Sequence, residues 1–181
     1  MIGNFMADSV KGSKFQMYPE GIQIGIKLHR EIDRFTDTHD IVRRSKMRLN
    51  GKYGHYAGVI VDIYYDHFLA KNWSNSSSIP LDVYVDSVYE LLKKNIEYLP
   101  TRTSNMLPYM IEFNWLFNYQ FIKGIQRVLE GMNQRTNNKS KMNYAIVDLK
   151  KHYQDFEQDF IEFFIELTKF SSEKLEELTS S

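Results

Sequence analysis

The stretch LHREIDRFTDTH, residues 28–39, places ionisable side chains at a helical spacing. His29, Asp33 and Asp37 follow one another at intervals of four residues, so a helix would carry them along one side. In a helical projection, His29 and Asp33 fall among the apolar residues that should face the core. A carboxylate buried there is very unfavourable unless it is paired or bound to a metal. Such a conflict between local sequence and helix burial is typical of a functional site.

The stretch GVIVDIYYDHFLAKNW, residues 58–73, repeats this pattern in a more apolar context. Asp62 and Asp66 are four residues apart, and His67 directly follows Asp66. A helix that is apolar almost all round is usually central in its fold. Two carboxylates one turn apart in such a place would raise each other's pKa. A divalent cation held between this helix and the first one would relieve the repulsion.

Two structural explanations compete with a metal site. A single buried histidine is most often hydrogen-bonded to a backbone carbonyl. An aspartate inside a helix is often one half of an ion pair, for which the available partners are Arg30, Arg34, Arg43 and Arg44. A histidine with two aspartates on each of two helices favours the metal site over both explanations. Histidine and carboxylate ligands without sulfur favour Mn²⁺, Mg²⁺ or Fe²⁺ over a structural zinc.

The elements that must hold these side chains all have helical patterns, because no stretch shows the alternation of a half-buried strand. Pro19 suits the first turn of a helix. Glycine and polar residues indicate loops at 50–58 and 133–143, and Pro100 and Pro108 bracket another loop. The helices are expected at 20–36, 40–50, 57–73, 81–97, 109–132, with a break near Asn114 or Asn118, and 144–176.

The composition indicates a single packed domain over residues 1–181, with six or seven helices. The hydrophobic fraction of 43% argues against disorder. Lys plus Arg and Asp plus Glu each number 23, so no net charge attracts nucleic acid. The absence of cysteine excludes disulfides and thiolate chemistry. No signal peptide or membrane-spanning apolar run is evident, which predicts a soluble, cytoplasmic protein without a membrane partner.

Longer stretches of the sequence resemble the acyl carrier protein phosphodiesterase family. GNFMADSVKG, YPEGIQIGIKLHREIDRFTDTH, GVIVDIYYDHFLAKNW and VLEGMNQR match it in order and spacing, over nearly the whole chain. The resemblance implies an HD-domain-like all-α bundle that hydrolyses holo acyl carrier protein to 4′-phosphopantetheine and apo protein, within fatty acid biosynthesis. It also implies dependence on manganese, with Mg²⁺ or Fe²⁺ as alternatives. Family members begin with a further short segment that contains a histidine, so this chain is expected to lack that segment.

The resemblance implies roles for individual residues as well. Asp8 corresponds to the aspartate of the family's A-D motif, and the D-x-x-x-D-H motif begins at Asp62. Asp62 or Asp37 is the candidate general base, and His39 or Asp37 would orient a histidine ligand. The competing interpretations are an ion pair or helix cap for Asp37 and a plain surface position for His39. The metal ligands are assigned to Asp8, His29, Asp33, Asp66 and His67, with Asp62 as a further ligand.

A basic stretch, RRSKMRLNGK at residues 43–52, lies between the two metal-binding helices. Acyl carrier proteins are small and acidic, so these cations would attract one to the site. A solvated helix face is the competing interpretation, and Arg135 is likewise a candidate either for phosphate binding or for a structural ion pair. The docking residues are Arg43, Arg44, Lys46, Arg48 and Lys52. The acidic residues expected to face away from them are Asp155, Glu157, Asp159, Glu162 and Glu166.

Two other functions stay open at the level of sequence. A phosphohydrolase that acts on a nucleotide or another small phosphoester would use the same ligands, but would gain nothing from an exposed basic helix. A non-enzymatic helical binding module would use the buried histidines and aspartates only as structural groups. The spacing of the ligands also leaves open whether one metal ion binds or two.

Overall fold

Every regular element in residues 1–180, the part of the chain that this structure describes, is helical. The structure is a computed structural model. It confirms the all-α prediction, although it has ten α-helices where six or seven were predicted. The helices are α1 (Ile2–Met6), α2 (Glu20–Thr38), α3 (Asp40–Tyr53), α4 (Ala57–Lys71), α5 (Leu81–Lys94), α6 (Thr101–Glu112), α7 (Trp115–Asn118), α8 (Ile122–Arg135), α9 (Ala145–Lys151) and α10 (Tyr153–Thr179).

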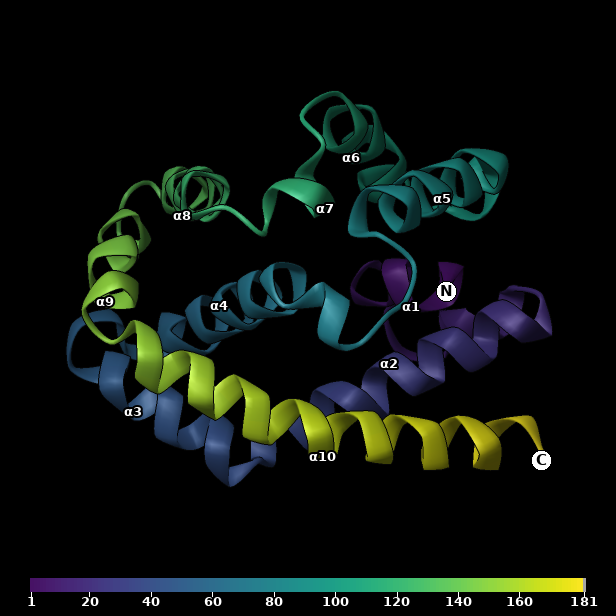
Figure 1. The fold of residues 1–181 in the computed structure, drawn as a ribbon. Coiled ribbons are helices and arrows are strands. Elements are labelled where there is room, and N and C mark those ends of the chain that lie inside the picture. The colour runs from purple at the N-terminus through teal and green to yellow at the C-terminus, as the bar shows by residue number, and fades with distance from the viewer. Residues whose placement is uncertain (181) are drawn as a thin grey trace.

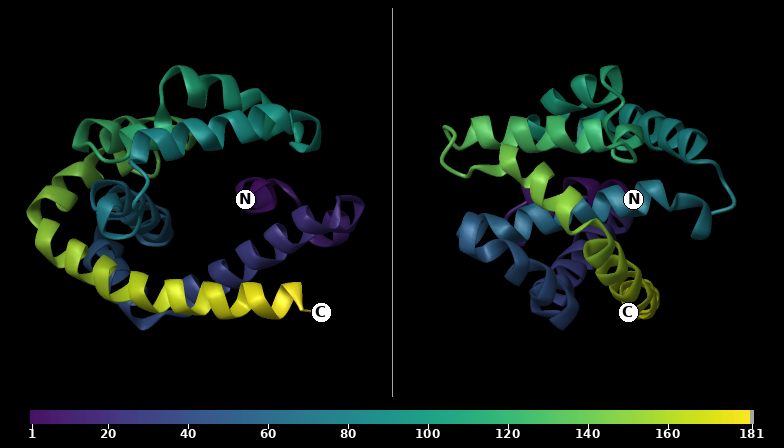
Figure 2. Two further views of the ribbon diagram at one scale, coloured as in Figure 1. Left: turned by 45° about the vertical axis from the view of Figure 1, so that its right-hand side comes forward. Right: turned by 60° about the vertical axis from the view of Figure 1, so that its left-hand side comes forward.

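The helices form two layers with α4 between them (Figure 1). Helices α5, α6, α7 and α8 make one layer, and α2, α3 and α10 make the other, while α9 connects them at one end. The turned views in Figure 2 show the same arrangement, with the short helix α1 also between the layers. Within residues 1–180, no helix combines the length and the apolar character needed to cross a membrane.

Helix α4 is buried over most of its surface, as its apolar sequence predicts. Tyr64 and Phe68 are fully buried there, and they belong to a core that also contains Leu129 of α8 and Phe156 of α10. A second core packs α1, α2, α5 and α6 together around residues such as Ile26. The fold therefore has two apolar centres: α4 belongs to the first, and the buried residues of α2 belong to the second, while Phe35 of α2 packs at the edge of the first.

Several helix boundaries differ from the sequence-based expectation, while the break expected near Asn114 or Asn118 occurs at both ends of α7. Pro108 lies inside α6 rather than at the end of a loop. It is exposed, so its missing N–H is lost on the solvent side while Leu107 and Met110 keep the helix packed. The expected C-terminal helix is divided at His152 into α9 and α10. Helix α3 continues to Tyr53, where Gly54 with a φ of 54° ends it.

A contact between two glycines brings α1 directly against the backbone of α2. A Cβ atom on Gly3 would lie 2.1 Å from the carbonyl oxygen of Ile22. A Cβ atom on Gly25 would lie 3.0 Å from the Cα atom of Gly3. No side chain larger than a hydrogen atom fits at Gly3 without moving α1. This contact fixes the turn that follows α1, the 3-10 helix η1 (Ala7–Ser9), over the middle of α2.

We expect Gly3→Ala to destabilise the protein by about 1–3 kcal/mol, because the added methyl group forces α1 away from α2. Thermal unfolding followed by circular dichroism measures the effect. Gly21→Ala is the matched control, since it lies in α2 and its Cβ atom would meet nothing within 4 Å. Equal melting temperatures for Gly3→Ala and the unaltered protein would contradict the tight contact.

Candidate metal centre

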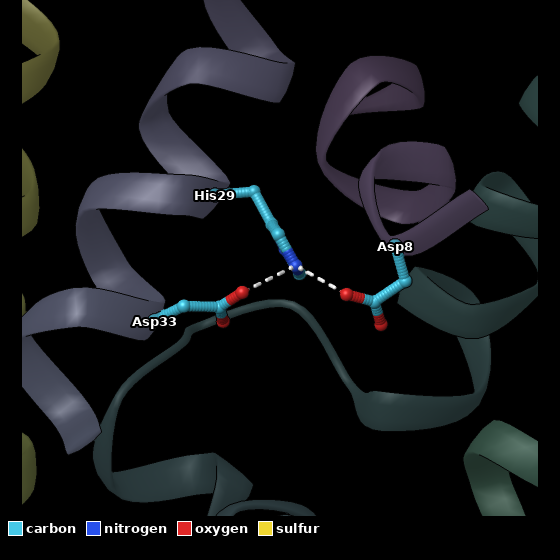
Figure 3. Close-up of side chains that lie close together, drawn as sticks. All are labelled: Asp8, His29 and Asp33. Atoms are coloured by element: carbon cyan, nitrogen blue, oxygen red, sulfur yellow. Dashed lines mark hydrogen bonds and ion pairs between the residues drawn. The ribbon is translucent and has the colours of Figure 1, made fainter. Parts of the chain in front are cut away.

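Three side chains from two elements converge in the arrangement expected of a metal site (Figure 3). The Nε2 atom of His29 lies 3.1 Å from Oδ1 of Asp8 and 3.1 Å from Oδ2 of Asp33. One candidate ligand atom from each residue lies within 4.8 Å of those of the other two. Asp8 and Asp33 are exposed, whereas the His29 side chain is only 20% exposed. A cation at this point would therefore be reached from solvent.

Helix geometry and the glycine contact together build this group. Helix α2 places His29 and Asp33 one turn apart, and η1 places Asp8 opposite them. The Oδ1 atom of Asn4, in α1, lies 3.5 Å from Nδ1 of His29. Asn4 thereby accepts a hydrogen bond from Nδ1 whenever that nitrogen carries a proton. Nothing in the sequence singles out Asn4, because its contact with His29 depends on how α1 crosses α2.

The protonation states in this group favour a positive charge at its centre. The hydrogen bond with Asp8 raises the pKa of His29, and attraction to Asp33 adds to this while burial opposes it. The same hydrogen bond lowers the pKa of Asp8. Burial raises the pKa of Asp33 despite the nearby His29. In the absence of a metal, a proton on His29 thus supplies the positive charge between the two carboxylates. A bound metal cation would supply that charge in its place.

Asp62 and Asp66 of α4 lie on its solvent-exposed side, which corrects the prediction that they are buried in the core. Loss of hydration nevertheless raises the pKa of Asp62 to about 6 and that of Asp66 to about 7. Water reaches these side chains, but protein surrounds them closely enough to penalise their charge. The two carboxylates therefore lie at the surface and yet favour the protonated form more than a free aspartate does.

Electrostatic contacts connect Asp62 to the group around His29. Besides desolvation, the pKa of Asp62 responds to Lys46, which lowers it, and to Asp37, Asp33 and Asp8, which raise it. The Nζ atom of Lys46 donates a hydrogen bond of 3.2 Å to Oδ1 of Asp37. Asp37 and Asp62 thus lie within electrostatic range of the Asp8–His29–Asp33 group, with Lys46 as a neighbouring cation, and Asp66 interacts in turn with Asp62.

His67 lies outside this centre, so the geometry gives no support to its prediction as a ligand. It is buried, and its Nδ1 atom lies 2.8 Å from the carbonyl oxygen of Tyr119. Its Nε2 atom lies 2.8 Å from the hydroxyl of Tyr153. Both ring nitrogens therefore already have partners, and burial lowers the pKa of the ring. Consecutive helical residues point about 100° apart, so His67 faces the core while Asp66 faces outward.

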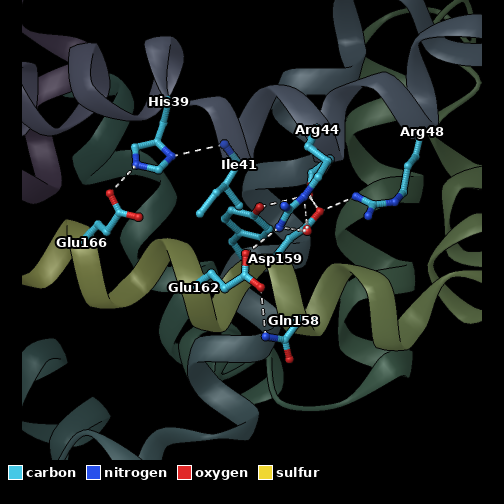
Figure 4. Close-up of polar contacts among 10 residues, drawn as sticks. His39, Ile41, Arg44, Arg48, Gln158, Asp159, Glu162 and Glu166 are labelled. Carbon is cyan, nitrogen blue, oxygen red and sulfur yellow. Dashed lines mark hydrogen bonds and ion pairs between the residues drawn. The ribbon is translucent and has the colours of Figure 1, made fainter.

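His39 connects two helices instead of orienting a ligand histidine. Its Nδ1 atom accepts a hydrogen bond of 3.3 Å from the backbone N–H of Ile41, which caps α3. Its Nε2 atom lies 3.2 Å from Oε2 of Glu166 in α10 (Figure 4). The ring also packs against Phe35 and Phe163. Neither the predicted orienting role nor a plain surface position describes this residue.

The basic stretch of α3 faces the acidic stretch of α10, so the prediction that they face apart is wrong (Figure 4). Arg44 donates to Asp159 at 2.7 Å and to Glu162 at 2.7 Å. Arg48 also pairs with Asp159, which is only 2% exposed and accepts a further hydrogen bond of 2.6 Å from Ser45. A carboxylate this deeply buried needs such partners. These arginines therefore hold α3 to α10.

The remaining predicted docking residues are paired as well. Arg43 lies 3.0 Å from Asp40, Lys46 pairs with Asp37, and Lys52 lies 2.8 Å from Asp148. Arg135, the predicted phosphate-binding residue, is exposed in the last turn of α8, and α8 packs against α4, α7 and α9 rather than η1 or α2. Another arginine does approach the centre. The charge of Arg102 in α6 contributes to lowering the pKa of Asp8.

We expect Arg48→Met to lower the stability of the folded protein by about 1–3 kcal/mol, because it leaves the buried Asp159 carboxylate with one fewer donor. Urea unfolding measures the change. Arg43→Met is the matched control, since its pair with Asp40 is exposed and should contribute less than about 1 kcal/mol. Equal losses in the two variants would contradict the structural role of Arg48.

The raised pKa of Asp66 makes a prediction for the metal-free protein. The folded state favours the protonated carboxyl, so this stabilising contribution is complete below the ordinary pKa of 3.8 and is lost as pH rises through about 7. The melting temperature should therefore fall between about pH 4 and pH 7 and level off above that, and Asp66→Asn should reduce this fall. Asp86→Asn, an exposed carboxylate of α5, is the control. A steeper fall in Asp66→Asn would refute the assignment.

Comparison with known proteins adds independent information about this centre. Residues 1–167 match the model of a family described as acyl carrier protein phosphodiesterase. A protein of that name from Photorhabdus laumondii is 30% identical over 91% of this chain and 83% of its own length. Proteins of the same name from Klebsiella pneumoniae and Escherichia coli are 32% and 31% identical, each over 95% of this chain and 90% of its own length.

No solved structure matches the chain. The family match nevertheless includes all of the elements that carry the centre, from Asp8 in η1 to Asp66 in α4. On this evidence, the chain belongs to the acyl carrier protein phosphodiesterase family.

Proposed function

We propose that this protein is a hydrolase that cleaves the phosphodiester bond of holo acyl carrier protein. Water would add to the phosphorus atom, and the bond to the serine oxygen of the carrier protein would break. The products would be 4′-phosphopantetheine and apo carrier protein with a free serine. The observation that supports this most directly is the family match over residues 1–167, which contains the complete Asp8–His29–Asp33 group.

We infer that Asp8, His29 and Asp33 bind one Mn²⁺ ion, with Asp66 as a further ligand. The fit rests on an imidazole nitrogen and carboxylate oxygens that converge in a solvent-accessible group, without sulfur. When bound, such an ion would neutralise phosphoryl oxygens and acidify a water molecule. An HD-domain-like relationship is also part of this proposal, and it rests on the sequence resemblance.

The neighbouring side chains would supply the general base, the orientation of His29 and a positive charge beside the ion. Asp62, with a pKa of about 6, is poised to accept a proton from the attacking water near neutral pH. Asp37 is less suitable as this base, because Lys46 already holds its carboxylate. Asn4 would keep Nε2 of His29 directed at the ion by accepting from Nδ1. Lys46 supplies positive charge between Asp37 and Asp62, which favours one ion over two.

Metal binding is tested by Asp33→Asn. We expect this variant to bind Mn²⁺ at least about tenfold more weakly, because an amide oxygen carries no charge to replace that of the carboxylate. Isothermal titration calorimetry gives the affinity, and native mass spectrometry gives the number of ions per chain. Asp86→Asn should bind as the unaltered protein does. Unchanged affinity in Asp33→Asn would remove this residue from the centre.

The reaction is tested by incubating the protein and Mn²⁺ with holo acyl carrier protein and following the mass of the carrier protein. We expect the mass to fall by that of the phosphopantetheine group and Asp62→Asn to slow this strongly. A parallel set of nucleotides and small phosphoesters should not be hydrolysed at a comparable rate. Turnover of that set without loss of phosphopantetheine would favour a small-molecule phosphohydrolase, and no turnover of either would favour a binding module.

A further inference from the structure

A short cationic segment follows the candidate metal centre directly in the chain. Residues 9–19 contain two lysines, Lys11 and Lys14, and no acidic residue. Most of the segment forms the 3-10 helix η2 (Gly12–Met17), from which both lysines project into solvent. Met17 ends this element and is 85% exposed, more than any other large hydrophobic residue described in the structure. Methionine is enriched in protein interfaces, whose rims are polar and solvent-accessible.

Helix α2 holds this segment in a fixed position. Arg30 donates hydrogen bonds of 2.8 Å and 2.9 Å to the carbonyl oxygens of Val10 and Gly12, and its guanidinium lies 5.1 Å from the centre of the Phe15 ring. At the other end, the side chain of Gln23 donates a hydrogen bond of 2.8 Å to the carbonyl oxygen of Tyr18. A partner that binds here would meet a preformed surface, with little loss of backbone entropy.

The lysines of this region differ from the bases of α3 in having no acidic partner. Within residues 1–180, the side chains of Lys11 and Lys14 make no ion pair or hydrogen bond. The ammonium of Lys27, exposed on the adjoining face of α2, lies 5.7 Å from the centre of the Phe15 ring and likewise has no carboxylate partner in that range. Their charge is therefore available to a partner from solution.

We propose that Lys11, Lys14, Met17 and Lys27 form the surface on which an acidic carrier protein docks, which we call the η2 surface. The proposal rests on the proposed function for the identity of the partner. The η2 surface adjoins the centre, because Lys11 is three residues from Asp8 and Arg30, which binds the carbonyl oxygens of Val10 and Gly12, directly follows His29 in α2. Complementary charge would guide the carrier protein to this edge, from which its serine-linked phosphate can reach the centre.

The test compares two charge reversals of equal size. Lys11→Glu/Lys14→Glu alters the η2 surface, and Lys150→Glu/Lys151→Glu alters exposed lysines of α9, at the other end of the molecule (Figure 1). Binding of apo acyl carrier protein is measured by calorimetry at about 50 mM and about 300 mM NaCl. We expect the η2 variant to raise the Kd at least about tenfold at low salt and to lose most of the salt dependence.

The α9 variant should stay within about twofold of the unaltered protein. Lys11→Gln/Lys14→Gln, which removes the charges without reversing them, should lose less affinity than the η2 charge reversal and more than the α9 variant. Matching circular dichroism melts establish that all variants are folded. Equal losses in the η2 and α9 variants, or binding by the η2 variant as tight as that of the unaltered protein, would overturn the docking surface. Because binding is measured without turnover, this result is independent of whether phosphopantetheine is released.

Discussion

The backbone contact of Gly3 with Gly25 is the constraint on which the candidate centre depends. It brings α1 within hydrogen-bonding reach of α2, so Asn4 contacts one nitrogen of His29 and the turn after α1 carries Asp8 to the other. A side chain at either glycine would separate these elements. A hydrogen bond of 3.0 Å from Thr103 of α6 to Ser9 then attaches the same turn to the opposite layer. The ligand group is thus assembled by contacts between short segments that individually contribute little core.

The distribution of charge follows from the same architecture. The chain carries 23 bases and 23 acids, yet the two signs are not evenly matched in space. On α3 and α10 they are paired, because the buried Asp159 requires the guanidinium groups beside it. Around His29 the acidic side chains are in excess. Lys46 lies among them, where it donates a hydrogen bond to Asp37 and lowers the pKa of Asp62. Along η2 the bases are unpaired. A neutral total therefore coexists with an anionic centre beside a cationic surface.

The position of the centre between two apolar cores explains its unusual protonation. Asp62 and Asp66 emerge from α4, which belongs to one core, while His29 and Asp33 emerge from α2, which belongs to the other. Where the two meet, water reaches the carboxylates but the surrounding protein still raises their pKa values. Such groups exchange protons near neutral pH and gain strongly from a bound cation. The junction of the cores thus supplies the electrostatic setting that phosphodiester hydrolysis requires.

The sequence by itself determined the helical class, the approximate extent of α2 and α4, and the relative directions of side chains within each helix. Spacing is enough for these properties, because a helix repeats every 3.6 residues wherever it lies. It therefore identified the pairs His29 with Asp33 and Asp62 with Asp66. It also missed the division at His152 and the helical setting of Pro108, where packing of neighbouring residues decides whether a helix continues.

Tertiary structure alone decided which side of each helix faces water and which distant residue supplies each counter-charge. Asp66 points outward and His67 inward because packing leaves only one narrow face of α4 uncovered, and the sequence alone does not say which face that is. Arg44 meets an acid 115 residues away, so its pairing depends on how α10 packs against α3. The contact of Asn4 with His29 depends likewise on the crossing of α1 and α2. Local spacing carries no information on these contacts, because burial and charge pairing are set by elements far apart in the chain.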